Sequence, residues 1–255
     1  MTYATGPGAF LIPLGMAAAA GLMGSIAVMR RMALASDALS HIALPGIAIA
    51  LLVHVNPFLG GLIALVLGTV LVWAIEYRSR IPTDVVVGVI FSAALALGSL
   101  LASGDELIEA LFGSPNTSDS FNLIGLGGAS LVIVFIVRYR SQLVIRLVSP
   151  DLARPAGINV PRLDLLYLLA FALTIALGLR YLGVLLMGSL IIIPAATAMR
   201  LGTNLRTMQT ISVAIAMLAT LSGTLLAPVL RLAAGPLIIV IAASIFFLSL
   251  AVRRA

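Results

Sequence analysis

Two residues with side chains that can bind a metal, Asp37 and His41, lie four positions apart in the segment S-D-A-L-S-H-I-A-L-P-G, residues 36–46. On a helix this spacing places both side chains on one face. A carboxylate and an imidazole together suit a divalent first-row cation such as Mn²⁺, Fe²⁺ or Zn²⁺, although two ligands do not complete a closed site. The alternative is a structural pair, in which Asp37 caps the helix and His41 forms one interhelical hydrogen bond.

The surroundings of this pair are strongly apolar. The chain is 62% hydrophobic and 9% charged, whereas a soluble domain carries about 25% charged residues. It is therefore an integral membrane protein, in which a polar residue at membrane depth is costly and is a candidate for function. Pro45 and Gly46 follow in the same span, and proline removes one backbone hydrogen bond. We expect these two residues to form a helix break that lines the pathway of the cation.

Apolar segments that can each cross ~30 Å of hydrocarbon recur along the whole chain. They predict an all-α fold, with residues 1–255 forming one polytopic transmembrane bundle of eight to nine helices. The nine expected spans are 9–29, 36–54, 58–76, 84–103, 121–137, 163–179, 182–199, 208–229 and 236–252.

The basic residues, which are all arginine, indicate the orientation of the bundle. With the N-terminus outside, all of them except Arg180 and Arg231 fall on the inner side, as the positive-inside rule requires. Their excess over acidic residues is therefore a topology signal and does not indicate a nucleic-acid partner.

Two connecting segments have distinct chemistry. The outer segment 103–120 carries Asp105, Glu106 and Glu109 and no basic residue, so we expect an acidic surface. The inner segment contains S-P-D-L-A-R-P-A-G-I, which predicts a short polar helix ended by Pro155 and Gly157. That helix is expected to face lipid headgroups or a partner protein.

Absent motifs limit the function classes further. The sequence has no lysine and no G-x-x-x-x-G-K-[ST] motif, so energy must come from another subunit or from an ion gradient. It also lacks G-x-S-x-G and H-E-x-x-H, which argues against an intramembrane enzyme, and it has no cysteine for a thiolate metal site.

Several longer motifs extend over nearly the whole chain. They are R-R-M-A-L-A-S-D-A-L-S-H-I-A-L-P-G (30–46), D-V-V-V-G-V-I-F-S-A-A-L-A-L-G (84–98), L-F-G-S (111–114), S-P-D-L-A-R-P-A-G (149–157), G-V-L-L-M-G-S-L-I-I-I-P-A-A-T-A (183–198) and G-P-L-I-I-V (235–240). Through them the chain resembles the membrane permeases of bacterial zinc and manganese ABC importers, the ZnuB-like and MntB-like family. Two departures are V-S-P-D where the family commonly has F-D-P-E, and a scarcity of histidine. The sequence therefore leaves zinc, manganese and iron open as the transported ion.

The resemblance implies a fold, a location and partners. The fold would be similar to that of the cobalamin-type ABC importer permeases, in a bacterial inner membrane. The permease would form a homodimer with two cytoplasmic ABC ATPase subunits and receive its ion from an extracytoplasmic metal-binding protein. No permanently bound cofactor is expected. The alternative is a gradient-driven secondary transporter or channel that works without an ATPase.

The resemblance also implies roles for particular residues. The D-x-x-x-H of the family, implicated in coordinating the metal, falls on Asp37 and His41. The coupling helix that seats in the ATPase corresponds to a second group of residues. Separately, because the outer segment is acidic, we expect it to contribute to docking of the delivery protein. The coupling residues are Asp151, Ala153, Arg154 and Gly157, and the docking residues are Asp105, Glu106 and Glu109.

Overall fold

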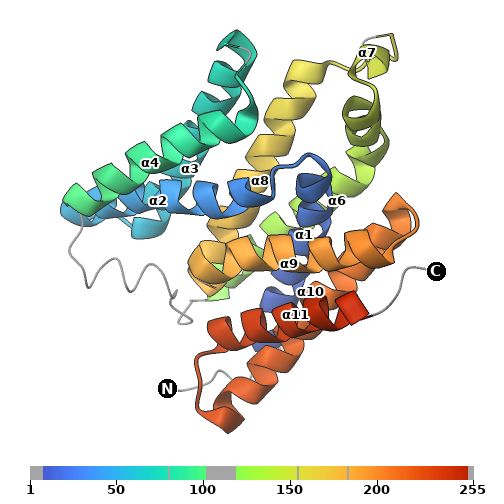
Figure 1. The fold of residues 1–255 in the computed structure, drawn as a ribbon. Helices are drawn as coiled ribbons and strands as arrows, with labels where there is room; N and C mark the ends of the chain where they lie inside the picture. The colour runs from blue at the N-terminus through green and yellow to red at the C-terminus, as the bar shows by residue number, and fades with distance from the viewer. Residues whose placement is uncertain (1–7, 80, 102–118, 154, 183, 252–255) are drawn as a thin grey trace.

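The structure is a computed structural model that describes residues 8–79, 81–101, 119–153, 155–182 and 184–251 (Figure 1). Within these ranges the regular elements are all α-helices. Their bounds are α1 Gly8–Met29, α2 Ala33–Leu52, α3 Pro57–Ser79, α4 Thr83–Leu101, α6 Asp119–Val148, α7 Pro150–Ala153, α8 Val160–Leu182, α9 Val184–Leu201, α10 Leu205–Leu230 and α11 Ala234–Ala251.

Each of the nine expected spans falls on one of the long helices. Seven of them are long and apolar enough to cross a membrane. The other two expected spans lie on α6 and on α9, whose apolar part, Leu186–Leu201, is shorter. The all-α transmembrane bundle predicted from composition is therefore confirmed.

Helix α6 is longer than its predicted span, which ended at residue 137. The helix continues to Val148 and includes Arg138, Arg140 and Arg146. Charged residues mark where a helix leaves the membrane, but they do not end the helix. Arginine, glutamine and leucine are all good helix formers, so the helix continues beyond the membrane boundary. The predicted inner loop is therefore partly an extension of α6.

Successive helix ends lie on different sides of the bundle. In Figure 1 the turn between α3 and α4 and the short helix α7 lie at the top, while the turns between α2 and α3 and between α10 and α11 lie at the left and lower left. This arrangement is the one expected of helices that cross a layer one after another.

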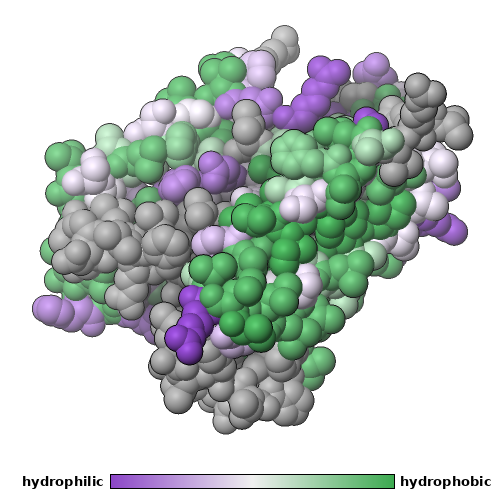
Figure 2. All heavy atoms as spheres, turned by 60° about the horizontal axis from the view of Figure 1, so that its bottom comes forward, coloured by the Kyte–Doolittle hydropathy of each residue, from purple (hydrophilic) through white to green (hydrophobic). Residues whose placement is uncertain are grey.

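The outer surface of the bundle is widely apolar. Figure 2 brings forward the side that is at the bottom of Figure 1, where α10 and α11 lie, and shows a broad hydrophobic face. On these two helices the exposed apolar side chains include Leu218, Leu225, Val240, Phe247 and Leu248. Such a surface is stable in contact with lipid but not with water.

The core of the bundle contains α1, α8 and α9, with α2 packed beside them. Its largest fully buried side chains include Met23 of α1, Tyr167 and Phe171 of α8, and Met187 of α9. Small residues bring α2 close to α3, because a Cβ placed on Gly46 would overlap the carbonyl oxygen of Gly60. Helix α2, which carries the candidate ligands, is thus held between α3, α4 and α9.

Candidate metal site

Asp37 lies inside helix α2 and not at its end. The helix begins at Ala33, and its N-cap, Met32, forms no side-chain capping hydrogen bond. At a rise of about 1.5 Å per residue, Asp37 and His41 lie about 6 Å and about 12 Å along the axis from Ala33. A capping role for Asp37 is therefore ruled out, and both side chains belong to the first half of the span.

His41 is held by packing. Its ring centroid lies 5.5 Å from that of Phe91 on α4, with the rings tilted by 57°. Its Nε2 atom lies 4.0 Å from Oδ1 of Asp37, while its buried Nδ1 atom has no hydrogen-bond partner among the described residues. The interhelical hydrogen bond of the structural alternative is thus not present in this part of the chain.

The carboxylate of Asp37 is left uncovered by a glycine on the neighbouring helix. A Cβ on Gly188 of α9 would lie 3.2 Å from Oδ1 of Asp37. The backbone of α9 therefore passes close to the carboxylate, whose side chain is still 56% exposed in the single chain. The nearby hydroxyls of Ser36 and Ser40 donate to carbonyl oxygens of their own helix, at Ala33 and Asp37.

The separation of the two ligand atoms suits a shared ion. Bonds from Zn²⁺ to imidazole nitrogen or carboxylate oxygen are about 2.0–2.2 Å long. One ion can therefore contact Nε2 of His41 and Oδ1 of Asp37, 4.0 Å apart, after a small rotation of either side chain. No group of three or more His, Asp or Glu side chains with metal-binding geometry occurs among the described residues. The pair is thus an incomplete shell.

Helix α2 does not break at Pro45 and Gly46, in contrast to the prediction. It is continuous from Ala33 to Leu52, with Pro45 inside it. A single lost hydrogen bond is tolerated because packing on both sides supports the turn. Gly46 faces Gly60 of α3, and Gly98 of α4 approaches Pro45. These two residues serve close helix packing, and their position beside a pathway stays a prediction.

The inner segment forms the short helix that was predicted, as α7. Asp151 is exposed, whereas Ala153 is fully buried within the chain itself. Gly157 has a φ of +73°, and a Cβ there would meet no atom within 4 Å. Ala153 therefore supports the segment from within, and the surface available to a partner is formed by its exposed neighbours. Arg154 lies outside the described residues.

Asp105, Glu106 and Glu109 all lie outside the described residues, so their docking role stays a prediction. His54 is exposed in the turn between α2 and α3, where its φ is +55°.

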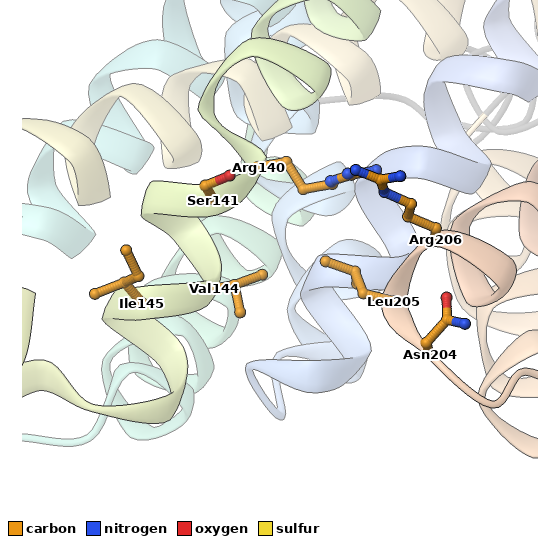
Figure 3. A pocket seen from close by; sticks show the side chains of 7 residues that line it. All are labelled: Arg140, Ser141, Val144, Ile145, Asn204, Leu205 and Arg206. Carbon is orange, nitrogen blue, oxygen red and sulfur yellow. The ribbon is translucent and has the colours of Figure 1, made fainter.

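An open cavity of about 550 Å³ lies between α6 and the turn that precedes α10 (Figure 3). Arg140 from α6 and Arg206 from α10 both line it. Arg140 also donates a hydrogen bond to Oε1 of Gln209 at 3.5 Å. Arginines far apart in sequence thus meet on one side of the bundle, as the topology prediction requires.

Sequence reasoning missed Asp164. This carboxylate, on the second turn of α8, accepts hydrogen bonds from Arg30, which directly follows α1, and from Arg146 of α6. The available signal was a single acidic residue within V-P-R-L-D-L, just inside an apolar span. Which arginines it pairs with depends on how α1, α6 and α8 pack, and this could not be read from spacing.

The chain is similar to permeases of several metal importers. It is 33% identical over 239 residues to the high-affinity zinc uptake system membrane protein ZnuB of Haemophilus influenzae, covering 91% of each chain. It is 31% identical over 235 residues to the manganese import system permease protein ScaB of Streptococcus gordonii, covering 90% of this chain and 84% of that protein.

The fold is similar to that of a solved permease structure. The PsaBC structure from Streptococcus pneumoniae in complex with Fab matches 96% of this chain and 91% of that chain, with a TM-score of 0.81 and 27% sequence identity. A putative metal-chelate type ABC transporter in an inward-facing conformation matches with a TM-score of 0.73 at 18% identity, which supports the fold alone.

The sequence and structure similarities favour an ABC importer permease over a gradient-driven transporter. ATP hydrolysis belongs to a separate subunit, in agreement with the missing P-loop. None of the similar proteins reported above supports a gradient-driven carrier. The model of the ABC 3 transport family matches residues 3–253, and the chain therefore belongs to that family as the membrane-spanning permease of an ABC transporter.

Proposed function

We propose that this permease carries zinc or manganese inward across the membrane, and that Asp37 and His41 hold the ion during transit. The names of the zinc and manganese permeases among its relatives support this cargo. Iron(II) has the same preference for carboxylate and imidazole ligands and is the third candidate.

The observation that carries the proposal is that, within the described residues, neither side chain has the capping or interhelical hydrogen-bonding role that a structural pair would have. Asp37 does not cap α2, and Nδ1 of His41 lacks a partner among the described residues. A buried imidazole nitrogen and a carboxylate at membrane depth are both costly in an apolar bundle unless something else satisfies them. A passing divalent cation satisfies both, and it leaves again because two protein ligands bind it incompletely.

A homodimer would complete the site. Two copies of the pair would supply up to four ligands if both α2 helices line one pathway. Four nitrogen and oxygen ligands suit tetrahedral Zn²⁺, while Mn²⁺ would keep water molecules in its remaining positions. The exposed side of Asp37 supports this arrangement, since it is free to face a second copy.

The partners follow from the two sides of the bundle. Two ABC ATPase subunits would bind the arginine-rich inner side at α7, and a metal-binding delivery protein would dock on the acidic outer segment. This arrangement has the N-terminus outside, in a bacterial inner membrane. Arg30, Arg140, Arg146 and Arg206 all line cavities near helix ends on the side predicted to be inner, which supports it.

Reconstitution tests the proposal directly. The permease and its ATPase are placed in phospholipid vesicles with the delivery protein, and uptake of radioactive zinc and of radioactive manganese is measured with ATP. We expect ATP-dependent uptake of at least one ion, saturable and abolished by a chelator on the delivery side. ATP hydrolysis without uptake of either ion would reject this cargo.

A further inference from the structure

The carboxylate of Asp164 ties three helices together. Arg30 from the end of α1 donates to its Oδ1 atom, and an amino nitrogen of Arg146 from α6 lies 3.2 Å from its Oδ2 atom. The side chains are 15%, 27% and 12% exposed for Arg30, Arg146 and Asp164. At such low exposure a hydrogen-bonded ion pair is screened little by solvent, so it constrains its helices strongly. We call these three residues the inner latch.

The inner latch closes the base of the segment that contains α7. Arg146 lies four residues before Pro150, and Asp164 lies on the second turn of α8. The ion pair therefore joins the two ends of the segment 147–163. A second contact anchors the same base, because Nε1 of Trp73 on α3 donates to the carbonyl oxygen of Pro161 at 3.1 Å. Within this base, Asp164 is the residue that contacts both the preceding helix α6 and the residue after α1.

Arg30 connects the inner latch to the candidate metal site. Arg30 is the first of the three residues, with Arg31 and Met32, that separate α1 from α2, and Asp37 follows on the second turn of α2. The guanidinium carbon of Arg30 also lies 4.5 Å from the ring centroid of Tyr167, which fixes the side chain against α8. Asp164 is thus linked through Arg30 to the short connection that leads into α2.

The surroundings allow a second arrangement of the inner latch. A cavity of about 220 Å³ adjoins it and is lined by Glu76 and Thr83 as well as by Arg30, Arg146 and Asp164. Glu76, on α3, is a second carboxylate that lines the same cavity as Arg146. Transmission between distant sites requires an element with two discrete arrangements, and an exchange of Arg146 between Asp164 and Glu76 would provide it.

We propose that Asp164, held by Arg30 and Arg146, is the positioning residue that transmits movement of the ATPase-facing segment 147–163 to helix α2. The direction of this inference rests on the proposed function, in which that segment meets the ATPase. Asp164 does not touch the ion. It sets the position of the helix that does.

Thiol labelling tests the transmission without metal transport, because the chain has no cysteine of its own. Single cysteines are introduced by Ala156→Cys in the inner segment and by Val55→Cys after the outer end of α2, both at exposed positions. The rate of maleimide labelling of the purified permease–ATPase complex is measured with and without ATP and vanadate. We expect ATP and vanadate to change the rate at least threefold at both positions in the otherwise native chain.

The added substitution Asp164→Asn should affect the labelling responses at positions 156 and 55 differently. The position in the inner segment should still respond to ATP and vanadate, while the response at position 55 falls below 1.5-fold. Asp164→Glu, which keeps the carboxylate, should recover part of it. Asp84→Asn is the matched control, since it removes an exposed carboxylate from the first turn of α4 and should leave both responses intact.

If Asp164→Asn does not yield folded complex, Arg146→Gln removes only the partner nearest α7 and leaves Asp164 bonded to Arg30. It should also reduce the response at position 55. A full response at that position in Arg146→Gln or Asp164→Asn overturns the proposal, as does no response in the otherwise native chain. Failure of zinc and manganese uptake would reject the proposed cargo and leave these labelling results unaffected.

Discussion

Gly46 of α2 and Gly60 of α3 face each other so closely that a Cβ on either residue would overlap the carbonyl oxygen of the other. The contact is reciprocal, so the two helix backbones touch at this point. It explains why a glycine follows Pro45 in a helix that does not break there. Small residues that let backbones approach are typical of helix packing in membranes.

Gly46→Ala should destabilise the permease. The new methyl group would meet backbone atoms, which cannot rotate away, and overpacking of this kind costs about 1–3 kcal/mol. We expect a lower thermal unfolding midpoint in detergent, measured by tryptophan fluorescence or by light scattering. Gly88→Ala on α4 is the control, since a Cβ there meets nothing within 4 Å. Equal midpoints for the two variants would contradict the packing role of Gly46.

Asp37→Asn and His41→Ala should each abolish metal uptake. The first keeps the size of the side chain and removes its charge, while the second removes the imidazole. We expect uptake of zinc or manganese to fall at least tenfold, because each copy of the pair loses one of its two ligands. Uptake is measured in vesicles and normalised to the amount of assembled permease–ATPase complex.

A structural pair predicts the opposite result for these variants. Folding or assembly would be lost, and the molecules that survive would transport normally. Asp84→Asn serves as a control for the loss of a carboxylate and should transport like the native chain. Native uptake rates in both Asp37→Asn and His41→Ala would exclude the site.

Gly157→Ala should strain the inner segment and reduce ATPase stimulation. The φ of Gly157 is +73°, and a residue with a Cβ pays about 1–2 kcal/mol in the left-handed region. We expect weaker association with the ATPase in co-purification and less stimulated hydrolysis. Gly127→Ala is the matched control, because a Cβ at Gly127 also meets no atom but no unusual φ opposes it. Gly157→Asn should be milder, since asparagine tolerates positive φ better than alanine.

Cysteines placed at Ser118 and Ser141 test the orientation of the bundle. The arginine distribution places residue 118 outside and residue 141 inside. An impermeant thiol reagent should therefore label Ser118→Cys in intact cells and should label Ser141→Cys only after the membrane is opened. Labelling of Ser141→Cys but not Ser118→Cys in intact cells would show that the orientation is the opposite one.

Neutralising Asp105, Glu106 and Glu109 together should slow binding of the delivery protein. Surface charge mainly affects the association rate and its dependence on salt. We expect the triple amide variant to show a lower association rate at low salt, a weaker salt dependence and an unchanged unfolding midpoint. Stopped-flow binding at two salt concentrations measures both quantities. Identical kinetics would leave the outer segment as a solvated surface only.

The helices and the shared face of Asp37 and His41 could be predicted from sequence because each depends on local information. The spans follow from continuous apolar runs, and the shared face of Asp37 and His41 follows from helical periodicity. The extension of α6 to Val148 was missed, since charge marks the membrane boundary and not the end of the helix. The predicted helix break at Pro45 was wrong, because packing from α3 and α4 keeps α2 continuous there.

The partners of polar residues could not be predicted because they depend on packing between distant segments. Asp164 joins Arg30, 134 residues away in sequence, and Ala153 is buried although its segment is polar. Phe91 and Gly188 come from two different helices to the site of Asp37 and His41. No spacing rule connects these positions, so only the folded chain shows them together.

The hydrogen bond from Trp73 to Pro161 gives this protein a built-in optical probe. Trp73 is the only tryptophan in the chain, so all indole emission comes from the contact between α3 and the start of α8. The ring also stacks with Tyr77 at a centroid distance of 6.0 Å, a donor for energy transfer at short range. Loss of the bond to Pro161 would change the polarity around the indole and shift its emission wavelength. Unlabelled permease can therefore report in real time, in a stopped-flow fluorimeter, when the base of the segment 147–163 moves.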